Sequence, residues 1–86
     1  MKKNAIVYLD GDKCRLGEID HQIAIDGKEY YVMASVNMDG CYVDNTIGNL
    51  DGVAAVEADL AWPVEACSLA SSADAESYES RRYSHS

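Results

Sequence analysis

The side chains best suited to chemistry are three cysteines and two histidines: Cys14, Cys41, Cys67, His21 and His85. Zinc sites usually combine such ligands in close pairs such as Cys-x-x-Cys, and this sequence contains no such pair. His21 falls among alternating apolar residues with no nucleophile beside it, so we expect a neutral structural histidine rather than a general base. Three widely spaced cysteines also argue against a disulfide framework and for a reducing compartment.

Two stretches rich in Asp and Asn outline a calcium loop and a phosphotransferase motif, but neither is complete. The run 44–52 has the outline of a calcium loop, but Thr46 occupies its third position and no glutamate stands at its twelfth. Asp10 and Asp12 flank a glycine after an apolar segment, as in aspartate phosphotransferases, yet the chain is too short for the parallel sheet of those enzymes. No glycine-rich loop ends in Lys-Ser or Lys-Thr, which excludes a typical phosphate-binding loop. We therefore predict no enzyme, no metal site and no cofactor.

Charge is the strongest feature of the sequence. Residues 4–80 hold all fifteen acidic residues but only Lys13, Arg15 and Lys28 as balancing cations. A field of one sign attracts positively charged surfaces and repels DNA, RNA and anionic membranes. We therefore expect a basic protein surface as the partner, and no direct binding to nucleic acid or membrane. The competing explanation is that the charge only keeps a small protein soluble.

The apolar segments favour a cytoplasmic protein. Lys2 and Lys3 could open a signal peptide, but the apolar run 5–9 that follows is too short for one. No window approaches the ~20 apolar residues that a membrane span needs. We therefore expect a cytoplasmic location, which for a viral protein means the host cell cytosol.

Four Asp-Gly pairs punctuate the first half of the chain: Asp10-Gly11, Asp26-Gly27, Asp39-Gly40 and Asp51-Gly52. This dipeptide favours two-residue type I′ hairpin turns, because both central positions have positive φ. The second turn would pair Ile19 with Ala34, and the third would pair Val36 with Val43. Both turns then put the same alternate residues of 28–38 on one face, which predicts an antiparallel sheet.

The first strand, 4–9, fits this register less well. A tight turn at Asp10-Gly11 would pair Val7 with Cys14 and would put the apolar residues of the strand on the wrong face. A β-bulge at Gly17 would restore the alternation. We therefore predict a β-meander of three to four strands.

The second half of the chain is Ala-rich and favours helix. Apolar residues recur at helical spacing from Val53 to Cys67, and Asp51 is a suitable N-cap. Pro63 should end or kink this helix and could start a further short helical turn. The stretch 53–64 also alternates, which is compatible with a strand. The predicted fold class is α+β, with one or two helices packed on one face of the sheet.

The predicted domain covers residues 1–67. Residues 68–86 contain seven serines and few large apolar groups, a composition that predicts a flexible C-terminal tail. Ile19, Val32 and Val36 should face the helix and form the core.

The opposite face of the sheet is the predicted binding surface. The register puts Glu18, Ser35 and Asp44 in one row, and neighbouring carboxylates along a strand lie ~6.6 Å apart, close to the spacing of nucleic-acid phosphates. Tyrosines between them would add the apolar contact area of an interface. The predicted binding residues are Glu18, Asp20, Glu29, Tyr31, Met33, Tyr42 and Asp44, with Asp26 and Asp39 in the turns.

In its size, acidity, Tyr-rich sheet and lack of an active-site motif, the chain resembles the small inhibitors that phages carry against bacterial defence, such as anti-CRISPR proteins. The resemblance lies in general character, and no functional residue carries over from it. It implies a non-enzymatic inhibitor that blocks a basic, nucleic-acid-binding surface of a partner, in some cases by nucleic-acid mimicry. The alternative is a small structural or assembly subunit, for example of a virion, that self-associates through its sheet.

Overall fold

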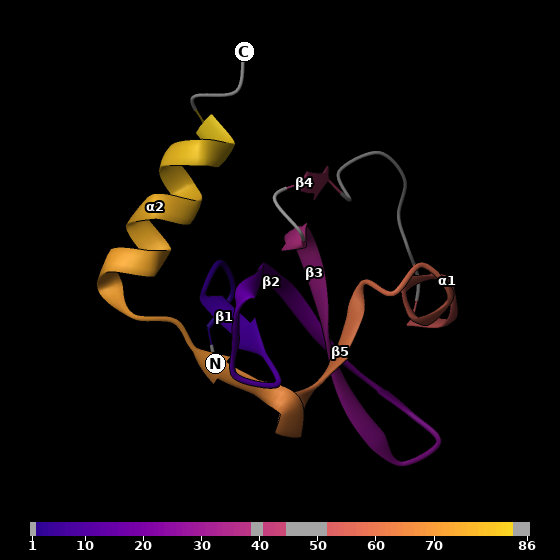
Figure 1. The fold of residues 1–86 in the computed structure, drawn as a ribbon. Coiled ribbons are helices and arrows are strands. Elements are labelled where there is room, and N and C mark those ends of the chain that lie inside the picture. The colour runs from indigo at the N-terminus through magenta and orange to yellow at the C-terminus, as the bar shows by residue number, and fades with distance from the viewer. Residues whose placement is uncertain (1, 39–40, 45–51, 84–86) are drawn as a thin grey trace.

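The computed structural model describes residues 2–38, 41–44 and 52–83, which form an α+β fold (Figure 1). The elements in chain order are β1 (Ile6–Leu9), β2 (Asp12–Ile25), β3 (Lys28–Met38), β4 (Cys41–Asp44), α1 (Gly52–Glu57), β5 (Ala61–Pro63), the 3₁₀ helix η1 (Val64–Ala66), β6 (Cys67–Leu69) and α2 (Ser72–Tyr83). The predicted fold class is confirmed.

The strands form one antiparallel sheet. Its order is β4-β3-β2-β1-β6, and β5 pairs with β3 outside this row. The first four strands are the predicted meander, whereas β5 and β6 come from the segments predicted as helix and tail. Because β2 covers one edge of β3, strands β4 and β5 share the other edge, at opposite ends of β3.

The turns at the first two Asp-Gly pairs follow the sequence prediction, whereas Gly52 of the fourth pair begins helix α1 and has no positive φ. Asp10 and Gly11 have φ of 54° and 70°, and Asp26 and Gly27 have φ of 50° and 80°. These positive values are those of a type I′ turn. Asp39, Gly40 and Asp51 lie outside the described residues, but the predicted pairing of Val36 with Val43 is confirmed.

The pairing of β2 with β3 differs from the prediction at one point. Glu18 pairs with Ser35 and His21 with Val32 as predicted, but Ile19 pairs with Met33 rather than with Ala34. The strands shift register twice here, so that one residue of each strand is extra, and the second shift cancels the first. The alternation therefore shifts by one residue across the double bulge: Ile19 and Val36 lie in the main core as predicted, but Tyr31 and Met33, predicted on the outer face, lie in it as well.

The first hairpin is irregular near its turn and not at Gly17. The register shifts between Tyr8 and Leu9, and Val7 pairs with Gly17 rather than with Cys14. Gly17 is needed for packing instead, because a Cβ there would lie 2.8 Å from Met33 Sδ and 2.9 Å from the Trp62 ring.

Helix α1 ends well before Pro63. Asp59 adopts φ of 57°, the Asp59 N–H donates to the Val56 carbonyl at 3.1 Å, and the Leu60 N–H donates to the Ala55 carbonyl at 2.8 Å. This pair of bonds is a Schellman motif, which terminates a helix. The chain then extends into β5, so the predicted helix up to Trp62 is wrong. The expected short helical turn after Pro63 is present as η1.

Residues 60–67, called the crossing segment below, run from the edge of β3 to the edge of β1, where β6 pairs with β1. They cover one face of the sheet and bury Trp62 opposite Tyr31. The buried residues on this side form the main core: Val7, Ile19, Tyr31, Met33, Val36, Leu60 and Trp62. This segment takes the place of the helix that the sequence predicted over Ile19 and Val36.

Residues 72–83 form helix α2 where a flexible tail was predicted, and residues 84–86 lie outside the described chain. The Ser71 hydroxyl accepts a bond from the Asp74 N–H at 3.2 Å, as an N-cap does. Tyr78 is 2% exposed and packs in a second apolar cluster with Ile6, Tyr8, Leu16 and Ala70. The cap therefore stabilises the start of this mainly polar helix, and the buried Tyr78 attaches the helix to the sheet.

Candidate functional site

The double bulge separates the predicted binding residues. Tyr31 is 4% exposed and Met33 is fully buried, and both belong to the main core. Glu18 is 7% exposed and pairs with Ser35 on the other face of the sheet. The predicted apolar contacts are therefore unavailable to a partner in this structure, and their expected position on the outer face is wrong.

The remaining predicted residues are spread over the molecule. Asp20 is half-buried and its carboxylate lies 2.6 Å from His21 Nδ1, while Glu29 and Asp26 are exposed near the turn that follows β2. The backbone of Tyr42 pairs with Asn37 and that of Asp44 with Ser35, in agreement with the predicted row of Glu18, Ser35 and Asp44. Asp39 lies outside the described residues.

Helix α2 covers part of this row. The Ser35 and Tyr78 hydroxyls lie 2.6 Å apart in a buried hydrogen bond. Asn37 is 4% exposed, and its Oδ1 has no hydrogen-bond partner among the described residues. We call this surface the helix-covered face; it carries the buried polar residues Ser35 and Asn37.

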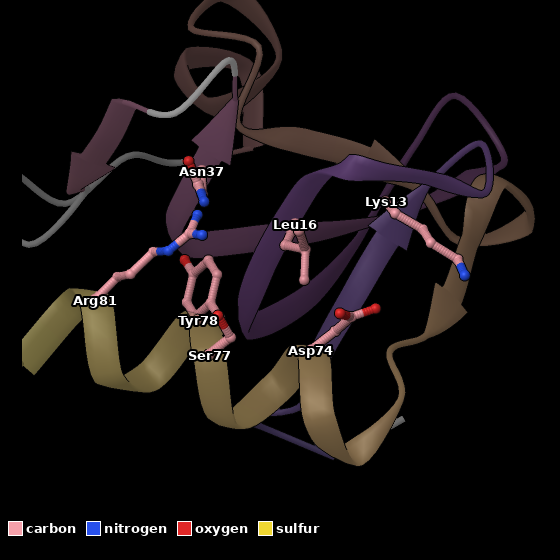
Figure 2. A pocket seen from close by; sticks show the side chains of 7 residues that line it. All are labelled: Lys13, Leu16, Asn37, Asp74, Ser77, Tyr78 and Arg81. Carbon is pink, nitrogen blue, oxygen red and sulfur yellow. The ribbon is translucent and has the colours of Figure 1, made fainter.

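A small pocket of about 90 Å³ opens beside the helix (Figure 2). Arg81 and Tyr78 lie near Asn37 at one end, and Lys13 and Asp74 lie toward the other end. Cationic and anionic groups therefore share the pocket, which can hold a few water molecules or a small polar group. This mixed lining does not select for one class of ligand.

The carboxylate of Asp74 helps to hold α2 to the sheet. Tyr8 donates a hydrogen bond to the Asp74 carboxylate, and the Ser71 N–H donates to the Tyr8 hydroxyl at 3.1 Å. The Tyr8 bond is the main reason why the pKa of Asp74 lies below its usual range; burial opposes this shift, and Ser71 and Lys13 add to it. The ionised form of Asp74 thus favours attachment of α2.

The cysteine and histidine side chains that the structure describes are those of Cys14, Cys67 and His21. Burial, followed by the nearby charge of Asp10, raises the pKa of the Cys67 thiol to about 11, which keeps it protonated near neutral pH. Cys14 is exposed and is also a free thiol. His21 contacts Asp20 and is exposed, not buried in the core. Among the described residues, no group of three or more potential metal ligands comes together.

Most of the acidic side chains are on the surface. Of those that the structure describes, all except Glu18 are exposed or half-buried: Asp10, Asp12, Asp20, Asp26, Glu29, Glu57, Asp59, Glu65, Asp74, Glu76 and Glu79. Surface ion pairs link Asp12 to Arg15 and Glu65 to Lys28, and Asp20 lies within hydrogen-bond distance of His21. The carboxylates that the structure describes lie mainly at the hairpin turns, around the end of α1 and along α2, with Asp20 in β2 and Glu65 in η1.

Comparison with known proteins gives no relative. No family model, no curated protein and no solved structure matches the chain. In the part of the chain that the structure describes, no helix is both long and apolar enough to cross a bilayer.

Proposed function

We propose that the protein is a non-enzymatic, acidic binding protein that blocks a basic, nucleic-acid-binding surface of a partner protein. The observation that carries this proposal is the excess of carboxylates on the surface, with net charge −8 over the whole chain. Such a field accelerates association with a positively charged surface and disfavours neutral or acidic ones. An anti-defence inhibitor that competes with nucleic acid, as some anti-CRISPR proteins do, is the setting that this chemistry suits best.

The contact surface in this proposal differs from the one expected from sequence. Tyr31 and Met33 are buried, so the contact falls to the exposed turns and to the ends of the helices. Carboxylates on separate loops can each accept a hydrogen bond from an arginine or lysine of the partner. The charges would set the association rate and the orientation, while affinity requires an apolar contact beside them.

Affinity capture from a bacterial lysate tests the proposal. We expect the immobilised protein to retain basic, nucleic-acid-binding proteins, and we expect a DNA duplex or raised salt to release them. A uniformly charge-neutralised variant, with the exposed Asp and Glu of α2 and the turns changed to Asn and Gln, is the control. Retention that neither salt nor DNA competes away would contradict the proposal.

Assembly through the sheet is the second candidate. Strand β6 ends the sheet, and its Leu69 is 66% exposed. An apolar residue on an edge strand is a site where a second copy can pair. Light scattering of the purified protein distinguishes the two candidates, because self-assembly predicts a stable oligomer at all salt concentrations.

A further inference from the structure

A groove lies beside the turn between β1 and β2, on the surface that the crossing segment forms. Its volume is about 390 Å³, within the range of ligand-binding clefts. The residues that line it come from three parts of the chain: Leu9, Asp10, Arg15, Asp59, Ala61, Trp62, Pro63 and Ala66. We call it the turn groove.

Apolar groups make the floor of the turn groove. Trp62 and Pro63 contribute ring atoms, and Leu9, Ala61 and Ala66 contribute aliphatic atoms. Trp62 is 3% exposed, so its ring is fixed in the main core and presents only a small part of its surface. A floor of this kind favours the flat or aliphatic part of a side chain rather than a solvated ion.

Two carboxylates, Asp10 and Asp59, stand at the groove and are exposed. The backbone of each is held by a hydrogen bond to another residue that lines the groove. The Asp10 N–H donates to the Ala66 carbonyl at 2.8 Å, and Trp62 Nε1 donates to the Asp59 carbonyl at 3.3 Å. These bonds fix the backbone from which each carboxylate extends, which limits the conformational entropy lost when a partner binds.

The charge of the groove decides which ligand it can take. Arg15 is the cation in the lining, and its Nε lies 3.5 Å from the Asp12 carboxylate, which offsets its charge. Asp10 and Asp59 leave the groove net negative, so it disfavours anions. An apolar floor beside two carboxylates matches arginine, whose planar guanidinium packs flat on apolar or aromatic groups and hydrogen-bonds carboxylates.

We propose that the turn groove seats an arginine side chain of the basic partner. This inference rests on the proposed function and names its anchoring contact. Basic surfaces that bind nucleic acid present arginines. A protein that competes with nucleic acid for such a surface can therefore bind one of these arginine side chains. Seating one arginine against the half-buried Ala61 and Pro63 and the two carboxylates supplies the apolar contact that dispersed surface charge does not.

Short peptides test the groove without knowledge of the partner. The probes are an acetylated, amidated Gly-Arg-Gly peptide and the same peptide with citrulline, a neutral analogue of arginine. Trp62 is the single tryptophan of the chain, so its fluorescence and its indole N–H resonance report on the groove. We expect the arginine peptide to shift both signals at saturation and the citrulline peptide to bind at least about tenfold more weakly. Equal binding of the two peptides, or no binding of either, would overturn the inference.

Matched variants locate the contact. Asp10→Asn and Asp59→Asn remove charge without changing shape, and asparagine tolerates the positive φ of both positions. Asp26→Asn is the control, because Asp26 has φ of 50° in an equivalent exposed turn outside the groove. We expect the double variant D10N/D59N to bind the arginine peptide at least about tenfold more weakly. The control D26N should change the affinity for this peptide less than about twofold.

An equal loss in D26N would show that only long-range charge acts; this result would overturn the groove but leave the proposed function in place. Conversely, capture of basic proteins that resists salt and DNA would remove the proposed function, whatever the peptide result. Thermal unfolding of each variant verifies that the fold is retained.

Discussion

The two faces of the sheet are held by different chemistry. On one side, the crossing segment buries Trp62 and Leu60 against an apolar main core. On the other, the helix-covered face carries the buried polar residues Ser35 and Asn37 beneath α2, and it combines the Ser35–Tyr78 hydroxyl pair with the smaller apolar cluster around Tyr78. Apolar burial stabilises in proportion to area, whereas each neutral hydrogen bond adds little net stability. The main core therefore determines whether the protein folds, and the helix-covered face determines whether α2 stays attached.

The largest effect is expected at Trp62. Trp62→Ala removes the ring that fills the space between Tyr31 and Gly17, and such truncations cost about 3–5 kcal/mol. This is much of the stability of a small domain, so we expect the whole protein to unfold at far lower urea concentration. Val53→Ala is the control, because Val53 is 62% exposed and should change little. Loss of α2 alone, with the sheet intact, would contradict the assignment of the main core.

Gly17→Ala tests the same core from the opposite direction. The added methyl group would come within 3 Å of Met33 Sδ and of the Trp62 ring, and overpacking of this kind costs about 1–3 kcal/mol. We expect a lower urea midpoint at an unchanged slope. The combination of Gly17→Ala with Met33→Ala should recover part of the loss relative to additivity, because the sulfur atom no longer obstructs the methyl group.

Tyr78→Phe should affect the helix-covered face more than the main core. The change keeps the ring but leaves the buried Ser35 hydroxyl without this partner, at a cost of about 1–2 kcal/mol. Amide hydrogen exchange should therefore accelerate in residues 72–83 before it accelerates in β2 and β3. Adding Ser35→Ala to the Tyr78→Phe variant removes the hydroxyl that lost this partner, so it should recover part of the lost stability. Uniform acceleration over all strands would show that the two faces unfold together.

The smallest effect is expected from pH. The pKa of Asp74 is lowered in the folded protein, so its ionised form contributes to α2 attachment at neutral pH, and this contribution is lost as pH falls through the lowered pKa. The protection factors of the α2 amides, which correct for the slower intrinsic exchange in acid, should fall before those of the sheet. Asp74→Asn should remove this pH dependence, whereas Glu76→Gln, at an exposed position on the same helix, should retain it.

The sequence predicted what local chemistry determines. Asp26-Gly27 has a strong preference for positive φ, so both the turn and the pairing of Ile25 with Lys28 follow from two residues. The double bulge has no such signature, since neither Asp20 nor Ala34 differs from an ordinary strand residue. Because of these two extra residues, Tyr31 and Met33 lie in the main core, and the predicted binding surface loses its apolar contacts.

The remaining differences come from distant contacts. The positive φ of Asp59 ends α1 and frees Trp62 to pair with Tyr31, although aspartate alone does not mark such a position. Alternation of apolar residues over 53–64 was compatible with a strand as well as a helix. The strand conformation of β5 depends on its pairing with β3, which the sequence of this stretch alone does not reveal. Tyr78 was one aromatic residue in a Ser-rich segment, and its bond to Ser35 joins residues that sequence patterns do not connect.

The pairing of β1 with β6, which aligns Val7 with Leu69, has a consequence for synthesis in the cell. Strand β1 is made before β2 to β5 and α1, so its outer edge stays unpaired until β6 has also emerged from the ribosome. Contacts between such distant residues slow folding and lengthen the period in which a nascent chain can aggregate or meet a chaperone.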